Sequence, residues 1–470
     1  MGNAVMSRFK GDAYRQVKVE AVKQQLEEKF KGPTKSRPSE RLAFYGRPKL
    51  HKEQITELEH LDWFDFLMHT ELCTMNYDAL TITDDMRFDH MVRMMENLKV
   101  PQTLRKPAKE LLAFIFDVHE LMHDNPYHNF SHVTDVTQYL YTLLLATHLA
   151  KRLRPIELAA AFIAAVCHDL DHPGLSNTFQ CKARTPLAVR WDDESPLENH
   201  HLWCSRKLVT KHDLLGGVAD ERDRARFLGV VRAMILSTDM AKHTKLMARI
   251  EGGLAEDGFN PLTTEDGTNL MLQIALKCAD ISNQARPWKV ANQWNEAVYS
   301  EFYHEGDLDA AAGRDVQPLQ NRKTNRIPNS TAGFIQFIVA PLYEAFVSIM
   351  KRCSSMEAEI DSSAVEECLV FLNKNKARYQ KQMNGEYVAP DEIEDELQGF
   401  AEDLRHSIGE GQRSEAALPG CVGRVKVATT LERCAVVLKG KGARVGDPAF
   451  DDLEDVAVNG DGVETIAMAS

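Results

Sequence analysis

Hydrophobic residues recur every three or four positions along most of this chain. From residue 61 to about 385, leucine, alanine, methionine and phenylalanine follow this spacing, while alternating β-branched residues are rare. The pattern predicts an all-α domain over residues 61–385. No internal repeat divides the segment, so it is expected to build one core.

The two ends of the chain have a different pattern. Residues 14–30 are polar with helical periodicity, and residues 31–40 are rich in helix-breaking residues, so we expect residues 1–60 to be a helical N-terminal extension. Residues 386–470 open with an acidic segment and continue as low-complexity sequence. That C-terminal tail is expected to be largely disordered.

Composition and charge narrow the range of partners. Of the 470 residues 44% are hydrophobic and 27% are charged, the balance of a globular protein. The formal net charge is −13 and no basic block is dense, so nucleic acid is not expected as a partner. We also expect no transmembrane segment, because the apolar runs look too short to cross a bilayer.

The cysteines and the N-terminus bear on the location of the protein. The nine cysteines form no CxxC pair and the first thirty residues hold no secretory run, which predicts a cytoplasmic protein with free thiols. Gly2 is the residue that N-myristoylation requires, but Met6 stands where the signal has serine or threonine. A lipid-anchored terminus and an ordinary frayed one therefore both stay open, as do scaffold anchoring and homodimerisation through the N-terminal helix.

Two histidines lie four residues apart in the sequence YHNFSHVTDV. If this segment is helical, His128 and His132 lie one turn apart on the same face and can reach one pocket. Pairs of this kind also occur on solvated helices. The segment alone does not decide between a shared pocket and a solvated helix surface.

A second cluster of ionisable residues follows an apolar run, in the sequence AAVCHDLDHPG. His168 and Asp169 are adjacent, and Asp171 and His172 come next. Burying so many ionisable groups is costly unless they are paired or bind a metal. Because adjacent residues point about 100° apart on a helix, His168 and Asp169 can share an ion only near a helix end, which the following proline and glycine predict.

Two later segments complete the candidate metal site. LENHH contains Glu198 and His201, and for His201 a hydrogen-bonded core position is favoured over a ligand role; CADISN contains Asp280, whose alternative is a helix cap. Two histidines and two aspartates suit zinc, manganese, iron or magnesium. Hydrolytic two-metal sites hold a bridging hydroxide, and a histidine outside the coordination sphere protonates the leaving oxygen. We assign metal binding to His132 and the general acid role to His128.

In their order along the chain, six motifs resemble the catalytic domain of class I 3′,5′-cyclic nucleotide phosphodiesterases, within the HD-type metal-dependent phosphohydrolases. The motifs are YHNFSHVTDV, CHDLDHPGLSN, DESPLENHH, STDMAKH, CADISN and GFIQFIVAPLYEAF. The resemblance covers residues 61–385 and implies a compact all-helical domain of about sixteen helices. It also implies hydrolysis of the 3′ ester of a cyclic nucleotide to the 5′-nucleotide.

The resemblance implies a role for individual residues. His128 matches the proton donor to O3′, and Asp169 matches the ligand that bridges two divalent ions, usually zinc and magnesium, with manganese as an alternative. The matching metal ligands are His132, His168, Asp169 and Asp280, and the residues that reach the second ion through water are His172, Glu198 and Thr238. The residues around the base are Tyr127, Met240, Ile281, Asn283, Val298, Thr331 and Phe334, of which Phe334 and Val298 clamp its two faces. Without the resemblance, such side chains are more often core than pocket.

One position departs from the family pattern. The family has a glutamine that makes two hydrogen bonds to the purine edge where this chain has Thr331, whose single hydroxyl cannot replace a planar amide. Losing that contact costs about 1–3 kcal/mol of binding. Asn283 accompanies adenine recognition in such enzymes, so cAMP is favoured over cGMP. The alternatives are a weak or inactive phosphodiesterase-like scaffold or nucleotide sensor, and a broader HD-type nucleotide phosphohydrolase.

Overall fold

The structure is a computed structural model that describes residues 72–356, 359–386 and 388. Within this part of the chain every regular element is helical, and none is a strand. It contains sixteen α-helices, α6 to α21. This confirms the all-α prediction and agrees with the expected number of about sixteen helices. The extension of residues 1–60, the acylation signal at Gly2 and the tail from residue 389 onward lie outside the described residues.

Helices follow one another along the whole described part of the chain, joined by short loops. In chain order they are α6 (Asp84–Asn97), α7 (Val100–Leu104), α8 (Ala108–Leu121), α9 (Phe130–Ala146), α10 (Leu149–Arg152), α11 (Pro155–Cys167), α12 (Asn177–Lys182), α13 (Pro186–Arg190), α14 (Pro196–Lys211), α15 (Glu221–Ser237), η1 (Met240–Lys242), α16 (His243–Ala255), η2 (Pro261–Thr263), α17 (Glu265–Asp280), η3 (Ser282–Ala285), α18 (Trp288–Ala311), η4 (Pro318–Gln320), α19 (Ile327–Phe334), η5 (Ile335–Val339), α20 (Ala340–Met356) and α21 (Ser363–Met383). By its contacts the chain divides into two units, residues 1–376 and 377–470, and every candidate site residue belongs to the first.

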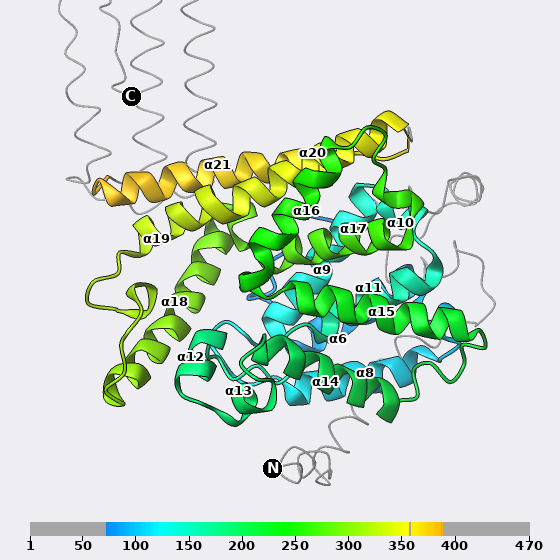
Figure 1. The fold of residues 1–470 in the computed structure, drawn as a ribbon, viewed down its shortest axis with the longest axis horizontal. Coiled ribbons are helices and arrows are strands. Elements are labelled where there is room, and N and C mark those ends of the chain that lie inside the picture. Colours follow the sequence, from blue (N-terminus) through cyan, green and yellow to red (C-terminus); the bar gives the residue numbers. More distant parts are fainter. Residues whose placement is uncertain (1–71, 357–358, 387, 389–470) are drawn as a thin grey trace, which may run out of the picture. The chain divides into compact units, whose positions relative to one another are not determined.

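Four helices near the centre of Figure 1 hold the candidate site: α9, α11, α15 and α17. Helix α11 packs against α9 and α15, and α17 packs against the same two helices. Every residue of α11 from Ala159 to Cys167 is at most 2% exposed. Many of these side chains are small, so the neighbouring helices approach closely and the end of α11 is held firmly in the core.

A buried ion pair joins the segment after η3 to α9. Arg286 and Asp135 are both fully buried, with Nη2 of the arginine 2.8 Å from Oδ1 of the aspartate. The same guanidinium donates to the carbonyl oxygen of Tyr77 at 3.1 Å and lies 4.6 Å from the ring centroid of Tyr139. Asp135 follows the two histidines of the first motif, but its partner is Arg286.

Arg286→Leu is expected to lower the free energy of unfolding by about 3–5 kcal/mol, because it leaves the Asp135 carboxylate buried without a partner. Chemical denaturation followed by circular dichroism measures this loss. The control is the double variant Asp135→Leu with Arg286→Leu, which should recover most of the stability because no charge stays uncompensated. Equal losses in both variants would contradict this account.

The longest apolar stretch, Ile327–Met356, comprises α19, the π-helical turn η5 and α20. By length and composition it could cross a membrane, with a hydropathy of 1.6 over its best window, so the prediction that no stretch reaches that length is wrong. A core helix of a soluble protein passes the same test, and in this chain 44% of the window is buried. Helix α20 packs against α16 and α17.

Candidate active site

Helix α9 begins at Phe130 because Asn129 caps it. The Asn129 side chain accepts hydrogen bonds from the backbone N–H groups of Ser131 at 2.8 Å and His132 at 3.1 Å. His132 therefore lies in the first turn, whereas His128 precedes the helix. The prediction that both histidines share one helical face is wrong: their ring centroids are 5.8 Å apart at an interplanar angle of 81°.

Helix α11 ends where the sequence predicted, with His168 as its C-terminal cap. The Nδ1 atom of His168 lies 2.8 Å from the carbonyl oxygen of Ala165. Because a carbonyl oxygen only accepts, Nδ1 carries a proton and Nε2 keeps its lone pair when the ring is neutral. That Nε2 atom is buried and has no hydrogen-bond partner.

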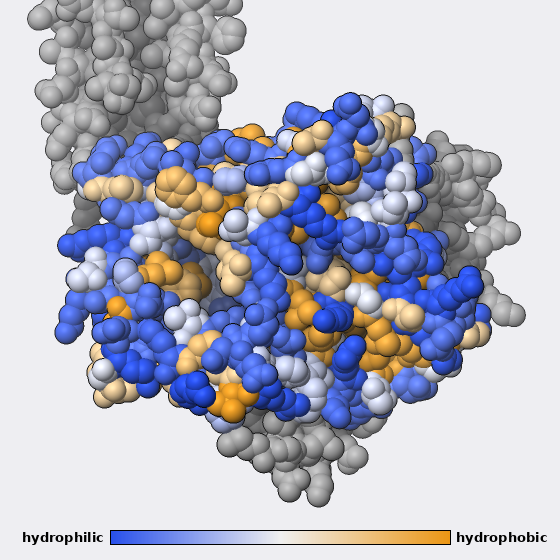
Figure 2. All heavy atoms as spheres, in the orientation of Figure 1, coloured by the Kyte–Doolittle hydropathy of each residue, from blue (hydrophilic) through white to orange (hydrophobic). Residues whose placement is uncertain are grey.

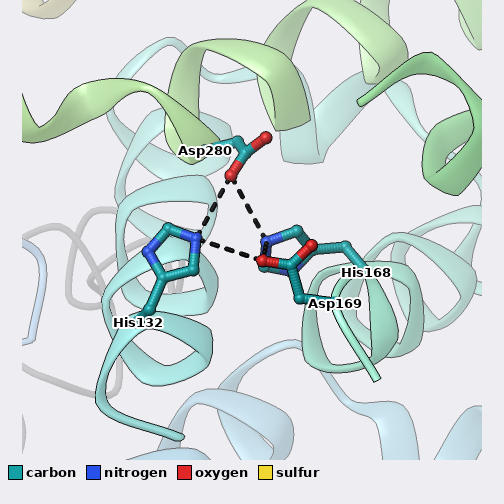
Figure 3. Close-up of side chains that lie close together, drawn as sticks. All are labelled: His132, His168, Asp169 and Asp280. Carbon is teal, nitrogen blue, oxygen red and sulfur yellow. Dashed lines mark hydrogen bonds and ion pairs between the residues drawn. The ribbon is translucent and has the colours of Figure 1, made fainter. Parts of the chain in front are cut away.

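Four side chains converge from three places in the sequence, as Figure 3 shows. His132 comes from α9, His168 and Asp169 from the end of α11, and Asp280 is the last residue of α17. His132 Nε2 lies 3.2 Å from Asp280 Oδ1 and 3.5 Å from Asp169 Oδ2. His168 Nε2 lies 3.4 Å and 3.3 Å from the same two oxygens. We call these four residues the metal group.

The metal group has the geometry of a metal site. Metal–ligand bonds of about 2.0–2.2 Å in a tetrahedron place neighbouring ligand atoms about 3.3–3.6 Å apart, close to the distances within the group. Burial acts to lower the pKa of His168, yet its close contacts with the charged Asp169 and Asp280 raise that pKa well above its usual value. Two carboxylates that face two histidines favour a positive charge between them, which a divalent cation would supply.

A neighbouring cluster of Asp171, His200 and Cys204 is better explained by hydrogen bonds. His200 Nε2 lies 2.9 Å from Asp171 Oδ2, and His123 Nε2 lies 2.8 Å from the other oxygen of that carboxylate. These separations are shorter than the edge of a metal tetrahedron. Burial and the Asp171 charge also raise the pKa of the Cys204 thiol far above its usual value. The cluster anchors the loop that follows Asp169.

Glu301, on α18, holds His128 in place and was missed by the sequence analysis. Its Oε1 accepts hydrogen bonds from the backbone N–H groups of Tyr127 and His128, both at 2.7 Å. Its Oε2 lies 2.5 Å from His128 Nδ1. Burial opposes ionisation, but the charge and hydrogen bonds of His128 keep the pKa of Glu301 below its usual value. The carboxylate thus accepts a hydrogen bond from Nδ1–H, which leaves His128 Nε2 available to contact a substrate.

His172 packs flat against His128, with ring centroids 3.8 Å apart and an interplanar angle of 17°. Its Nδ1 accepts a hydrogen bond of 3.0 Å from the backbone N–H of Gly174. Burial and then the charge of His128 lower the pKa of His172 well below its usual value, so it stacks as a neutral ring. Asn125 Nδ2 donates to the carbonyl oxygens of both histidines at 2.9 Å and ties the two segments together.

Glu198 and Thr238 are buried near this centre. Burial and then the charge of Asp239 raise the pKa of Glu198 to about 7, and Asn177 Nδ2 donates to both of its oxygens. The Thr238 hydroxyl donates to the carbonyl oxygen of Ile235 at 2.8 Å. Within the described residues, no direct hydrogen bond or ion pair joins Glu198 or Thr238 to the metal group. Their role toward a second ion stays a prediction.

His201 occupies the core position that the sequence analysis favoured. It is 1% exposed, and its Nδ1 donates to the carbonyl oxygen of Leu170 at 2.7 Å. Its Nε2 lies 3.9 Å from Asp169 Oδ1, farther than any of the contacts within the metal group. It therefore lies beside Asp169 in the core, outside the metal group.

Two buried asparagines accept hydrogen bonds from neighbouring hydroxyl groups. The Tyr127 hydroxyl donates to Asn283 Oδ1 at 2.5 Å, and the Tyr127 ring lies 4.5 Å from that of His132 in the metal group. Asn283 Nδ2 is buried and has no hydrogen-bond partner among the described residues. The Thr331 hydroxyl donates to Asn295 Oδ1 at 3.0 Å, and these two residues are 2% and 4% exposed. Asn295 was not among the sequence candidates.

The remaining predicted base-binding residues lie on the helices around this centre. Met240 begins η1 and is 42% exposed, and Ile281 caps α17. Val298 on α18 and Phe334 at the end of α19 are both half-buried. None of the four takes part in a hydrogen bond or ring contact with the asparagines in the part of the chain that the structure describes. Figure 2 shows a recess in this face beside α18 and α19, with hydrophobic residues along its edge.

Comparison with known proteins identifies the family. A family model described as 3′5′-cyclic nucleotide phosphodiesterase matches residues 127–360, a range that holds every candidate site residue. The 3′,5′-cyclic-nucleotide phosphodiesterase regA of Dictyostelium discoideum is 31% identical over 310 residues, or 65% of this chain and 37% of that protein. The mouse high affinity cGMP-specific 3′,5′-cyclic phosphodiesterase 9A is 34% identical over 253 residues, or 53% and 45%. The alignments span less than half the length of either relative.

A solved structure shares the fold. The phosphodiesterase domain of the RhoPDE fusion protein from the choanoflagellate Salpingoeca rosetta superposes with a TM-score of 0.60 and 26% identity, covering 68% of this chain and 99% of that domain. The sequence match and the structural match thus agree on the same helical region. Residues 127–360 of this chain therefore belong to the class I 3′,5′-cyclic nucleotide phosphodiesterase family.

Proposed function

We propose that this protein is a metal-dependent 3′,5′-cyclic-nucleotide phosphodiesterase that hydrolyses the 3′ ester to give the 5′-nucleotide. One observation carries the proposal: the metal group and the Glu301-bound His128 lie side by side. The His128 and His132 rings are 5.8 Å apart, so a phosphate held at the metal group is within reach of the histidine. A metal site next to a positioned acid is what phosphodiester hydrolysis needs.

The metal group would hold the first of two divalent ions, which we expect to be zinc and magnesium, with manganese as an alternative. When bound, such ions neutralise the phosphate and activate water as the nucleophile. Asp169 would serve both ions; its Oδ2 lies beside the two histidines of the metal group, and its Oδ1 lies 3.9 Å from His201 Nε2. His172, Glu198 and Thr238 would reach the second ion through water.

His128 supplies the proton for the leaving group. Water attacks phosphorus and releases one proton to the solvent, the bond from phosphorus to O3′ breaks, and the proton on His128 Nε2 moves to O3′. Glu301 Oε2 accepts a hydrogen bond from His128 Nδ1–H at 2.5 Å, so it fixes the orientation of the ring and directs Nε2 toward the leaving oxygen. The neutral His172 ring supports the other face without adding a competing charge.

For the substrate we propose cAMP rather than cGMP. Asparagine pairs with adenine through N7 and the N6 amino group, donating to one and accepting from the other. Asn283 offers an unpartnered Nδ2 for N7, and its Oδ1, fixed by the Tyr127 hydroxyl, has a second lone pair for N6. The amide of Asn295, held by Thr331, would add a donor on the opposite wall. Phe334, Val298, Met240 and Ile281 would enclose the base.

The proposed activity is tested by initial rates on cAMP and cGMP with added Mg²⁺ or Mn²⁺. The proposal expects metal-dependent release of 5′-nucleotide, faster on cAMP. Faster hydrolysis of cGMP would overturn the substrate choice, for which the mouse relative gives a precedent in its name. No turnover at high enzyme concentration would favour a scaffold or sensor, and hydrolysis of nucleoside triphosphates instead would favour a broader phosphohydrolase.

Thr331→Val is expected to raise KM for cAMP by about fivefold, with little change in kcat. The valine has the shape of threonine but lacks the hydroxyl that orients the Asn295 amide, and one such hydrogen bond contributes about 1 kcal/mol. Steady-state kinetics measure the effect. Thr331→Ser keeps the hydroxyl and is the matched control. If valine and serine behave alike, Thr331 does not act through Asn295.

A further inference from the structure

A cavity of about 420 Å³ opens between α15, α16 and α17, and the proposed reaction does not use it. This volume lies in the range of small-molecule sites. Four of its lining residues are basic, although the chain as a whole carries a formal charge of −13. They are Arg232 on α15 and Lys242, Lys245 and Arg249 at the start and along the face of α16.

The cavity results from the choice of residues on the two facing helices. Gly229, Ala233 and Leu236 follow the helical spacing on the α15 side, and a side chain added at Gly229 would meet nothing within 4 Å. On the α16 side, Lys242, Lys245 and Arg249 repeat at intervals of three and four. The small side chains on α15 leave space unfilled, and the long cationic side chains of α16 line it. Leu236 and Leu246 make part of its wall apolar.

Two of the four cations lack a protein partner. Arg249 is paired with Asp266 at 2.6 Å, and Lys242 lies 3.6 Å from Glu194. Arg232 and Lys245 are exposed, and neither forms an ion pair or hydrogen bond with another residue in the described part of the chain. Two uncompensated positive charges at the mouth of an apolar cavity attract an anion with an apolar body.

We propose that this cavity binds a small organic phosphate, with the phosphate between Arg232 and Lys245 and an aromatic or aliphatic body against Leu236 and Leu246. Arginine and lysine together suit a phosphate group, the first through paired N–H donors and the second as a point charge. A mononucleotide has the right size for the volume. The phosphate could come from a soluble nucleotide or from a lipid headgroup, and the two sources share this chemistry.

The cavity is connected to the proposed active site through one short segment. Ser237 lines the cavity, and Thr238 and Asp239 follow directly in the sequence. The buried ammonium of Lys277 donates to the carbonyl oxygens of all three residues at 3.1–3.2 Å, and Lys277 lies on α17 three residues before Asp280. A ligand in the cavity therefore contacts a segment that is bonded to the helix carrying Asp280, and its proposed role is to regulate the enzyme.

The test is calorimetric titration of the metal-loaded full chain with 5′-AMP. The wild type is expected to show two classes of site, one at the metals and one in the cavity. The double variant Arg232→Ala with Lys245→Ala should lose the cavity class, with affinity weakened by at least about tenfold. The control, Lys109→Ala with Arg206→Ala, removes two exposed cations elsewhere and should keep both classes.

Further probes separate the source of the phosphate. Adenosine, which lacks the phosphate, should not fill the cavity class. If 5′-AMP does not fill it but the wild type sediments with phosphatidic acid vesicles and the double variant does not, the phosphate belongs to a lipid. The proposal is overturned if the double variant matches the wild type both in the 5′-AMP titration and in sedimentation with phosphatidic acid vesicles, or if the wild type binds neither probe in the cavity. Absence of the metal class alone would count against the proposed function and leave the cavity site standing.

Discussion

Replacing His128 with asparagine is expected to lower kcat by about a hundredfold to ten-thousandfold while the bound metal stays in place. The variant removes the proposed proton donor to the leaving oxygen, and a positioned general acid contributes a factor of this size. His128 lies outside α9 and is not part of the metal group, so elemental analysis should find the wild-type metal content. Loss of metal in this variant would show that the roles of His128 and His132 are wrongly divided.

Glu301→Gln tests whether the carboxylate positions the His128 ring. Glutamine keeps one acceptor oxygen but turns the other into an NH2 donor, so it cannot accept from both His128 Nδ1 and the backbone N–H groups of Tyr127 and His128. We expect kcat to fall by about tenfold and KM to change little. A purely structural role would lower the free energy of unfolding, measured by chemical denaturation, without lowering kcat of the folded enzyme.

Asp280→Ala is expected to abolish metal binding and to lower hydrolysis by at least about a thousandfold. Asp280 Oδ1 contacts both histidines of the metal group, so its loss removes one ligand and half of the negative charge that holds the cation. Metal per chain and initial rates should fall together. Treating the wild type with a chelator should cause the same loss, and added metal should restore the wild type but not the variant.

Asp171→Asn is the matched control for Asp280→Ala. It changes a neighbouring aspartate whose separations of 2.8 and 2.9 Å from two histidines indicate hydrogen bonds. The variant should keep its metal, although the loop after Asp169 loses some support. Equal metal loss in Asp171→Asn and Asp280→Ala would mean that contact distances do not distinguish the hydrogen-bonded cluster from the metal group.

The fold and the metal group could be predicted because each leaves a local trace in the sequence. Helical spacing of apolar residues marks the domain, and the proline and glycine after His172 mark the end of α11, where His168 and Asp169 emerge together. The first motif was harder. Asn129 looks like one more polar residue of a helix, but it caps α9 and so separates His128 from His132.

The residues that the sequence analysis missed act across long distances in the chain. Glu301 lies 173 residues from His128, and no sequence pattern near the histidine predicts that the two residues pair. One signal was present: Glu301, Glu305 and Asp309 are buried acids that repeat every four residues on α18, where a soluble helix would carry apolar side chains. Asn295 has no such signal, because its partner Thr331 lies on another helix.

The π-helical turn η5 sets the rotational phase between two parts of one long helical rod. A wide turn holds one residue more than α-helical geometry needs, and each residue rotates an α-helix by about 100°. If all five residues of Ile335–Val339 wound as a plain α-helix, the extra residue would no longer be absorbed within the turn. With α20 packed against α16, the Thr331 side of α19 would then rotate by about 100° away from Asn295. The hydrogen bond between Thr331 and Asn295 thus depends on one wide turn that absorbs a single extra residue.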